Sequence, residues 1–135
     1  MEQFTGKWKQ ERAENLDEYL TARGVPWIAR KAATVSSLHM EVEGKPDDTW
    51  RLYQYTTLRT IMDVTFTPGK EFDFKRMDGI ECKVTFRVDG MKLLQDTREA
   101  DGSIDVIKRE LMADGSLVQT LSCKDVVCKR YFTKV

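Results

Sequence analysis

Four Asp-Gly pairs divide the second half of the chain into segments of similar length. They stand at residues 78–79, 89–90, 101–102 and 114–115, so that neighbouring pairs are 11 to 13 residues apart. Asp-Gly is favoured in tight hairpin turns because both central positions of such a turn take positive φ. The regular spacing therefore predicts an antiparallel meander of short strands, each joined to the next by a tight turn.

The meander continues toward the N-terminus, where further turn signals lie at 44–48 and 68–69. We expect a first strand at 4–10 and nine more at 38–43, 49–55, 58–65, 71–76, 80–88, 91–98, 103–111, 117–123 and 126–133. A sheet of ten antiparallel strands usually closes or folds over on itself. Residues 1–135 are therefore expected to form one all-β domain that is long enough to bury a core.

A helical pattern interrupts the strands once, between the first and the second. Asn15 is followed three positions later by Glu18, which is a capping-box arrangement with Asn in place of Ser or Thr. Apolar residues then recur at helical spacing until Gly24, a residue typical of helix ends. We predict two short helices that form a helix-turn-helix, at 15–23 and 26–34.

Polar side chains fall on strand faces that are otherwise apolar. Gln54 shares a face with Trp50 and Leu52, and Gln119 lies between Leu117 and Leu121. A closed barrel that is too wide to be filled by side chains keeps a wet, partly polar interior, which can hold one small ligand. The pattern therefore predicts an internal cavity.

Two arginines, Arg109 and Arg130, stand near the middle of two of the last three predicted strands. Their faces also carry mostly apolar residues, namely Ile107, Leu111, Cys128 and Phe132. If these faces point inward, the guanidinium groups need an anion or water beside them, because burial of an unpaired charge is costly. Guanidinium binds carboxylate through a planar fork, so the pair is a candidate carboxylate clamp. The alternative is pairing with internal carboxylates or water, without any ligand head group.

The composition argues against several classes of function. Lys plus Arg and Asp plus Glu both total 22, so the formal net charge is zero, and we expect no nucleic-acid partner because no basic groove with interleaved aromatic residues is apparent. One histidine and three cysteines without a Cys-x-x-Cys pair favour neither a metal site nor a disulfide framework. Enzyme motifs are absent as well. We expect a monomeric, non-enzymatic protein without a cofactor, and a cytoplasmic one because no signal or membrane-spanning segment is apparent.

Several stretches resemble one known family when they are taken together and in order. They are 4–8 (Phe-Thr-Gly-Lys-Trp), 14–20 (Glu-Asn-Leu-Asp-Glu-Tyr-Leu), 24–25, 30–31, 78–83, and the run from 108–111 to 125–130. The set resembles the intracellular lipid-binding proteins, the group of cellular fatty-acid-binding and retinoic-acid-binding proteins. The Arg-Glu-Leu motif before an Asp-Gly turn is similar to the retinoic-acid-binding branch.

This resemblance implies a closed ten-stranded antiparallel up-and-down barrel, capped by the helix-turn-helix between the first two strands. The cavity of such a barrel holds one long-chain carboxylic acid. Arg109 and Arg130 match the two arginines that meet the ligand carboxylate, and Arg59 matches a third arginine of the retinoid branch. The tyrosine that usually completes the clamp is replaced by Phe132, while Tyr131 lies one residue away and should point outward.

The resemblance also implies roles for residues around the cavity and on the helices. The residues expected to line the cavity or its portal are Leu16, Tyr19, Leu58, Cys128 and Phe132. Arg30 and Lys31 match two of three basic positions of a nuclear-import signal in some members, and Arg23 lies near the third. The alternatives for this basic cluster are a solvated helix face and contact with anionic membranes during ligand transfer.

The sequence therefore predicts an intracellular carrier that binds a long-chain fatty acid and transports it. Two other functions stay open: retinoid binding, and a signalling shuttle that delivers its lipid to a nuclear receptor with the help of a nuclear import receptor. The shuttle function would add the nucleus to the expected compartments.

Overall fold

Two helices lie between the first and second of ten strands in the computed structural model, which describes residues 1–76 and 79–135. A single 3-10 turn, η1 (Glu2–Phe4), precedes β1 (Gly6–Glu14), and α1 (Leu16–Ala22) and α2 (Trp27–Val35) follow it. The remaining strands are β2 (His39–Gly44), β3 (Trp50–Tyr55), β4 (Thr60–Phe66), β5 (Phe72–Lys75), β6 (Glu81–Asp89), β7 (Lys92–Arg98), β8 (Ile104–Leu111), β9 (Leu117–Cys123) and β10 (Val126–Lys134).

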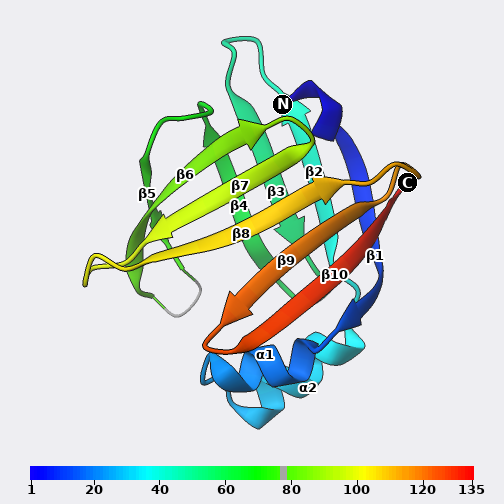
Figure 1. Cartoon of the computed structure of the whole chain (residues 1–135), viewed down its shortest axis with the longest axis vertical. Helices are drawn as coiled ribbons and strands as arrows, with labels where there is room; N and C mark the ends of the chain where they lie inside the picture. The colour runs from blue at the N-terminus through cyan, green and yellow to red at the C-terminus, as the bar shows by residue number, and fades with distance from the viewer. Residues whose placement is uncertain (77–78) are drawn as a thin grey trace.

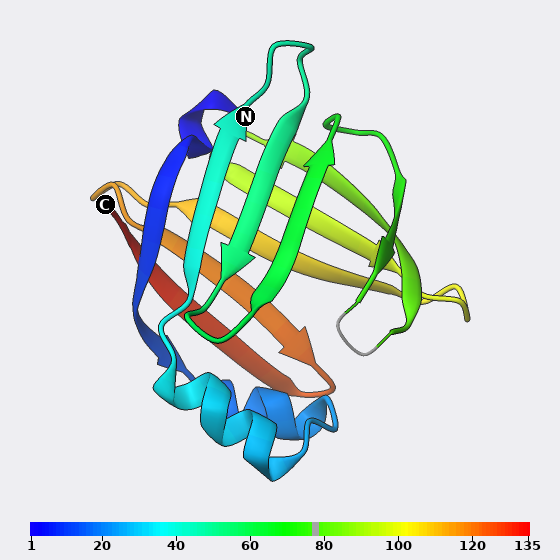
Figure 2. The ribbon, with the colours of Figure 1, turned by 180° about the vertical axis from the view of Figure 1, so that it is seen from behind.

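The strands form one antiparallel sheet in the order β4-β3-β2-β1-β10-β9-β8-β7-β6-β5. Strands that follow each other in sequence are paired, with one exception: β4 and β5 do not pair with each other and form the two edges of the sheet. β1 also pairs with β10. The sheet curls into a nearly closed barrel, and both helices lie together across one end of it (Figures 1 and 2). The predicted up-and-down barrel capped by a helix-turn-helix is confirmed.

The hairpins are confirmed too, but some of their turns are wider than expected. At the third Asp-Gly pair only the glycine takes positive φ: Gly102 has a φ of 85°, and the preceding Asp101 is not among the residues with positive φ. The Gly102 amide donates to the Glu99 carbonyl over 3.0 Å, and the Asp101 carboxylate accepts from the Ser103 amide over 2.9 Å. The same pattern recurs at 112–116. A wider turn that ends in a left-handed glycine is a common hairpin connection. Asp78 of the first predicted pair lies outside the described residues.

The start of α1 differs from the prediction. Asn15 takes a left-handed conformation, with a φ of 59°, and its side chain caps no helix amide, so the predicted capping box with Glu18 is wrong. The Asn15 amide nitrogen instead donates to the Val127 carbonyl of β10 over 3.1 Å. The side chain therefore ties the helix to the barrel, and it is not available for the cap. At the other end Gly24, with a φ of 80°, ends the helix as expected.

The main apolar core includes the end of the barrel away from the helices. Its largest fully buried side chains include Phe4 of η1 and Trp8, whose indole nitrogen donates to the Phe4 carbonyl over 3.1 Å. Figure 1 shows η1 at the end of the barrel opposite the helices. Five other buried side chains of the described residues are polar: they are Gln54, Gln95, Thr97, Arg109 and Gln119. No helix in the described ranges has the length and apolar character that crossing a membrane requires.

Candidate functional site

Three polar side chains form a row across β8, β9 and β10. In the sheet register Arg109 of β8 lies opposite Gln119 of β9, and Gln119 lies opposite Arg130 of β10. Directly opposed residues of antiparallel strands have Cβ atoms about 4.5–5.5 Å apart. Arg109 is 1% exposed and Gln119 is 3% exposed, so the row faces the interior of the barrel.

Arg109 is held by neutral amides. Its Nη1 donates to Gln95 Oε1 over 3.0 Å, its Nη2 donates to Gln54 Oε1 over 2.8 Å, and its Nε is buried without a partner. The guanidinium also lies 5.9 Å from the centre of the Phe86 ring. Burial without a counter-charge lowers the pKa of Arg109 to about 9. The group therefore keeps its positive charge at pH 7.

Arg130 shows the same kind of environment. Its Nε donates to Gln10 Oε1 of β1, and burial lowers the pKa of its guanidinium. Within the residues that the structure describes, no Asp or Glu oxygen lies within 4.0 Å of Arg109 or Arg130 as an ion-pair partner. No carboxylate in the described ranges therefore compensates the two charges.

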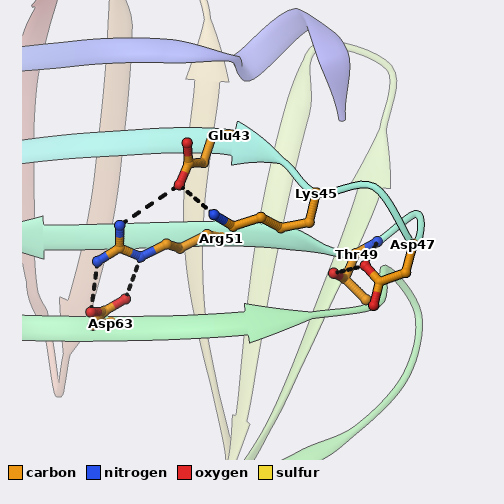
Figure 3. A network of polar contacts seen from close by, with 6 residues as sticks. All are labelled: Glu43, Lys45, Asp47, Thr49, Arg51 and Asp63. Atoms are coloured by element: carbon orange, nitrogen blue, oxygen red, sulfur yellow. Dashed lines mark hydrogen bonds and ion pairs between the residues drawn. The ribbon is translucent and has the colours of Figure 1, made fainter.

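An arginine on the outside of the same barrel is paired quite differently. Arg51 of β3 donates through Nε and Nη2 to the two oxygens of Asp63 on β4, each over 2.8 Å. Its Nη1 lies 3.7 Å from Glu43 of β2, which completes a network across three strands (Figure 3). The protein therefore provides carboxylates for this arginine on the surface and amides for the two in the interior.

The two inner arginines line a cavity of about 320 Å³. A second pocket of about 300 Å³ adjoins it and opens between α2 and the loop that joins β3 to β4. Residues common to both linings include Tyr19, Leu20, Leu38, Ile61 and Arg130. A mostly apolar path thus leads from the buried guanidinium groups to the surface at the helical end.

This arrangement is suited to binding an anion with an apolar tail. The guanidinium groups supply the charge, and the path supplies apolar walls. Among the described residues, no group of three or more His, Cys, Asp or Glu side chains is placed to hold a metal ion.

Arg59 lies away from the inner row. It is exposed, it belongs to the β3–β4 loop, and it lines the outer pocket together with Leu58, which is 68% exposed. The lining of the inner cavity includes Arg109 and Arg130 but not Arg59. The structure therefore gathers two of the three predicted arginines at one point and leaves the third at the mouth.

Three of the five predicted lining residues are packed against other side chains. Leu16 and Cys128 form a small core with Tyr19 under α1, and burial raises the pKa of the Cys128 thiol. Phe132 is 1% exposed and belongs to the main apolar core. Tyr19 does line both pockets, and Leu58 lines the outer one. The helix packs directly on the end of β10, which is why residues there are enclosed.

Position 132 brings no hydroxyl group to the arginines. The neighbouring Tyr131 points outward, where its hydroxyl donates to Glu14 Oε1 over 3.0 Å and its ring lies 3.7 Å below the guanidinium carbon of Arg12. The alternation that assigned Tyr131 to the outside is thus matched by its contacts.

The basic residues of the helices have partners within the chain. Arg23 lies 3.6 Å from Asp105 of β8, Arg30 donates to Asp17 over 3.1 Å, and Lys31 lies 5.1 Å from the centre of the Trp27 ring. The nuclear-import interpretation of Arg23, Arg30 and Lys31 stays a prediction.

The polar residues that sequence reasoning left without a role are four glutamines. Gln10, Gln54 and Gln95 accept hydrogen bonds from the two arginines, and Gln119 lies between them. Gln54 and Gln119 were visible as polar residues on apolar strand faces. Their bonding to Arg109 and Arg130 depends on which strands face each other across the barrel, which the strand pattern alone does not give.

Comparisons with known proteins agree with this geometry. Residues 2–132 match the model of the lipocalin / cytosolic fatty-acid binding protein family. Cellular retinoic acid-binding protein 2 of Mus musculus is 36% identical, over 99% of both chains. Sodium/calcium exchanger regulatory protein 1 of Doryteuthis pealeii is 37% identical, over 98% of this chain and 96% of that one.

A solved structure gives the same picture in three dimensions. The REP1-NXSQ fatty acid transporter superposes with a TM-score of 0.87 at 34% identity, over 100% of this chain and 98% of that one. The match to the family model over nearly the whole sequence, the relatives of similar length and the common barrel lead to one conclusion. The chain belongs to the lipocalin / cytosolic fatty-acid binding protein family.

Proposed function

We propose that this protein is a carrier for a long-chain fatty acid, which it holds in the barrel and transports through the cytoplasm. The carboxylate binds at Arg109 and Arg130, and the acyl chain follows the apolar path toward the mouth. Burial of each methylene group contributes about 0.8 kcal/mol, so the chain supplies most of the affinity and the arginines fix the orientation.

The observation that carries the proposal is a pair of inward-facing arginines, Arg109 buried and Arg130 half-buried, without a carboxylate partner among the described residues. A buried guanidinium that is bonded only to neutral amides remains an uncompensated charge, and here two of them line one cavity of about 320 Å³. An anionic head group supplies the missing charge. A relative named as a fatty acid transporter supports the same ligand class.

A retinoid is the second candidate, because a retinoic acid-binding protein is among the relatives. The main sequence argument for a retinoid is the trio of Arg59, Arg109 and Arg130. Arg59 is exposed at the mouth and is absent from the lining of the inner cavity, which weakens that argument. We favour a fatty acid because an unbranched chain places the fewest demands on the shape of the cavity.

Ligand exchange is proposed to occur at the mouth between α2 and the β3–β4 loop. Leu58 and Arg59 lie on one side of it, and residues of α2 such as Ala29 and Ala33 lie on the other. A shift of the helices or of the loop widens this opening, and lids of this kind commonly control access to an enclosed site.

The test is oleate binding to Arg130→Gln by isothermal titration calorimetry, with all-trans retinoic acid as a competitor. Loss of a charge-assisted hydrogen bond should weaken oleate binding by about tenfold or more. The matched control is Arg12→Gln, since Arg12 lies on the outer surface with a side chain 60% exposed. Far-UV circular dichroism checks that both variants are folded.

Unchanged oleate affinity in folded Arg130→Gln would refute the carboxylate clamp. If retinoic acid displaces oleate at concentrations well below those at which oleate displaces retinoic acid, the retinoid is the better ligand. Extraction of the lipid that co-purifies with the protein gives an independent identification.

A further inference from the structure

Two buried polar atoms in the row formed by Arg109, Gln119 and Arg130 have no partner in the described part of the chain. They are the Nε of Arg109, which is a donor, and the Oε1 of Gln119, which is an acceptor. The two residues lie opposite each other in the β8–β9 register, and both line the inner cavity. Buried polar groups are nearly always hydrogen-bonded, because an unsatisfied one is costly. The site therefore presents one open donor beside one open acceptor.

A simple carboxylate meets only half of this demand. An ionised carboxylate accepts hydrogen bonds but cannot donate one, so it can bond to Arg109 Nε and leaves Gln119 Oε1 unsatisfied. A hydroxyl group does both, since its oxygen accepts from Arg109 and its hydrogen is donated to Gln119.

The rest of the row leaves a place for the carboxylate itself. Arg130 uses its Nε for Gln10, and no hydrogen bond of its two Nη atoms to the described residues is found. Gln119 lies opposite both arginines in the register. A carboxylate at Arg130 and a hydroxyl between Arg109 and Gln119 would then occupy adjacent positions.

We propose that the preferred ligand is a 2-hydroxy fatty acid, whose carboxylate lies beside both guanidinium groups and is bonded by Arg130, while its hydroxyl bridges Arg109 Nε and Gln119 Oε1. This inference rests on the proposed function, because it assumes that a lipid carboxylate occupies the cavity. In a 2-hydroxy acid the two polar groups are on adjacent carbons, which is the order required by a carboxylate at Arg130 and a hydroxyl beside its register neighbour Gln119. Gln119 is then the residue that determines specificity.

The experiment compares 2-hydroxyhexadecanoate with hexadecanoate by isothermal titration calorimetry. The wild-type protein should bind the hydroxy acid about tenfold more tightly, and it should prefer one enantiomer, because the donor and the acceptor are fixed on different strands. In Gln119→Met, a change to an apolar side chain of similar length, the preference for the hydroxy acid should disappear. The matched control is Gln95→Met, which removes a bond to Arg109 Nη1 and should weaken both acids by the same factor.

Each result separates this inference from the proposed function. Equal binding of the two acids by the wild type, or a preference that survives in Gln119→Met, overturns the hydroxyl site but leaves the carrier intact; a water molecule between Arg109 and Gln119 would give that result. Failure of the wild type to bind either acid overturns the carrier as well. The enantiomer comparison needs only the wild-type protein, so it decides the matter even if Gln119→Met does not fold.

Discussion

Arg51 and Arg109 are the same residue type in two opposite settings of one barrel. Arg51 faces outward and meets both oxygens of Asp63, with Glu43 on its other side. Arg109 faces inward, is 1% exposed, and donates to the amide oxygens of Gln54 and Gln95, its hydrogen-bond partners among the described residues. The carboxylates are at the surface, where water would have solvated the charge in any case.

The difference indicates what each site is built for. A carboxylate beside Arg109 would have neutralised it and would have occupied the positions that a ligand head group needs. Glutamine accepts a hydrogen bond and orients the guanidinium without cancelling its charge. The interior therefore keeps a fixed, oriented positive charge that is open to an anion, and this costs stability in the empty protein.

The largest expected effect comes from making the inner site resemble the outer one. In Gln54→Glu a carboxylate replaces the amide that bonds to Arg109 Nη2. We expect oleate affinity to fall by about a hundredfold, because the new carboxylate neutralises Arg109 and repels the ligand. Calorimetric titration measures the loss, and Gln54→Met is the control for the lost hydrogen bond. Equal losses of oleate affinity in the two variants would mean that the lost hydrogen bond, and not the added negative charge, weakens binding.

Removing the inner charge should separate stability from binding. A buried charge that lacks a counter-charge destabilises the folded state, because it has lost its hydration. We therefore expect Arg109→Met to raise the free energy of unfolding of the ligand-free protein while it weakens oleate binding. Urea denaturation monitored by circular dichroism gives the first quantity and titration the second. A less stable variant would show that the amide bonds outweigh the cost of burial.

The outer arginine should matter far less. Arg51 and Asp63 have side chains 32% and 43% exposed, so Arg51→Gln should cost about 0–1 kcal/mol and leave oleate affinity unchanged. The hydrogen bonds from Arg51 lower the pKa of Asp63. Its contribution to stability is therefore present above the ordinary pKa of Asp and is lost as the pH falls through the lowered value. Urea denaturation as a function of pH should show the cost of Arg51→Gln vanishing in acid; a cost that persists there would assign it to packing.

The smallest effect is expected at Asp105, the partner of Arg23 between α1 and β8. Burial raises the pKa of Asp105 in spite of the nearby Arg23 charge. A raised pKa in the folded state means that the ionised form costs stability at pH 7, and that this cost disappears below the ordinary Asp pKa of about 3.9. Asp105→Asn should therefore be slightly more stable than the wild type at pH 7 and equal to it near pH 3. Thermal unfolding at the two pH values tests this, and a destabilised variant at pH 7 would show that the ion pair dominates.

Much of the barrel could be predicted from local signals. Regular turns, strand alternation and the glycine at position 24 are properties of a few consecutive residues, and they gave the right elements within a few positions. The errors lie where a distant residue competes with a local preference. Asn15 is the clearest case, because the Val127 carbonyl takes the side chain that the capping box required.

The candidate site was harder to predict for the same reason. The alternation of side chains along the strands predicts that Arg109 and Arg130 point inward, but it cannot show which residues face them across the barrel. Gln54 is 55 residues from Arg109 and Gln10 is 120 residues from Arg130. Trp27 illustrates the opposite limit: it is apolar and yet 62% exposed, because α2 covers the mouth of a pocket and does not bury itself in a core.

The pairing of β1 with β10 governs how the barrel is assembled. These are the first and the last strand in sequence order, and Glu14 and Lys129 are among their paired residues. Contacts between such distant residues close a large loop, which slows folding relative to local pairing. While the protein is being synthesised, β1 and β9 each keep an unpaired edge until β10 leaves the ribosome. The cavity is therefore enclosed only after β10 has been synthesised, and chaperones that shield strand edges are most useful to the protein just before that moment.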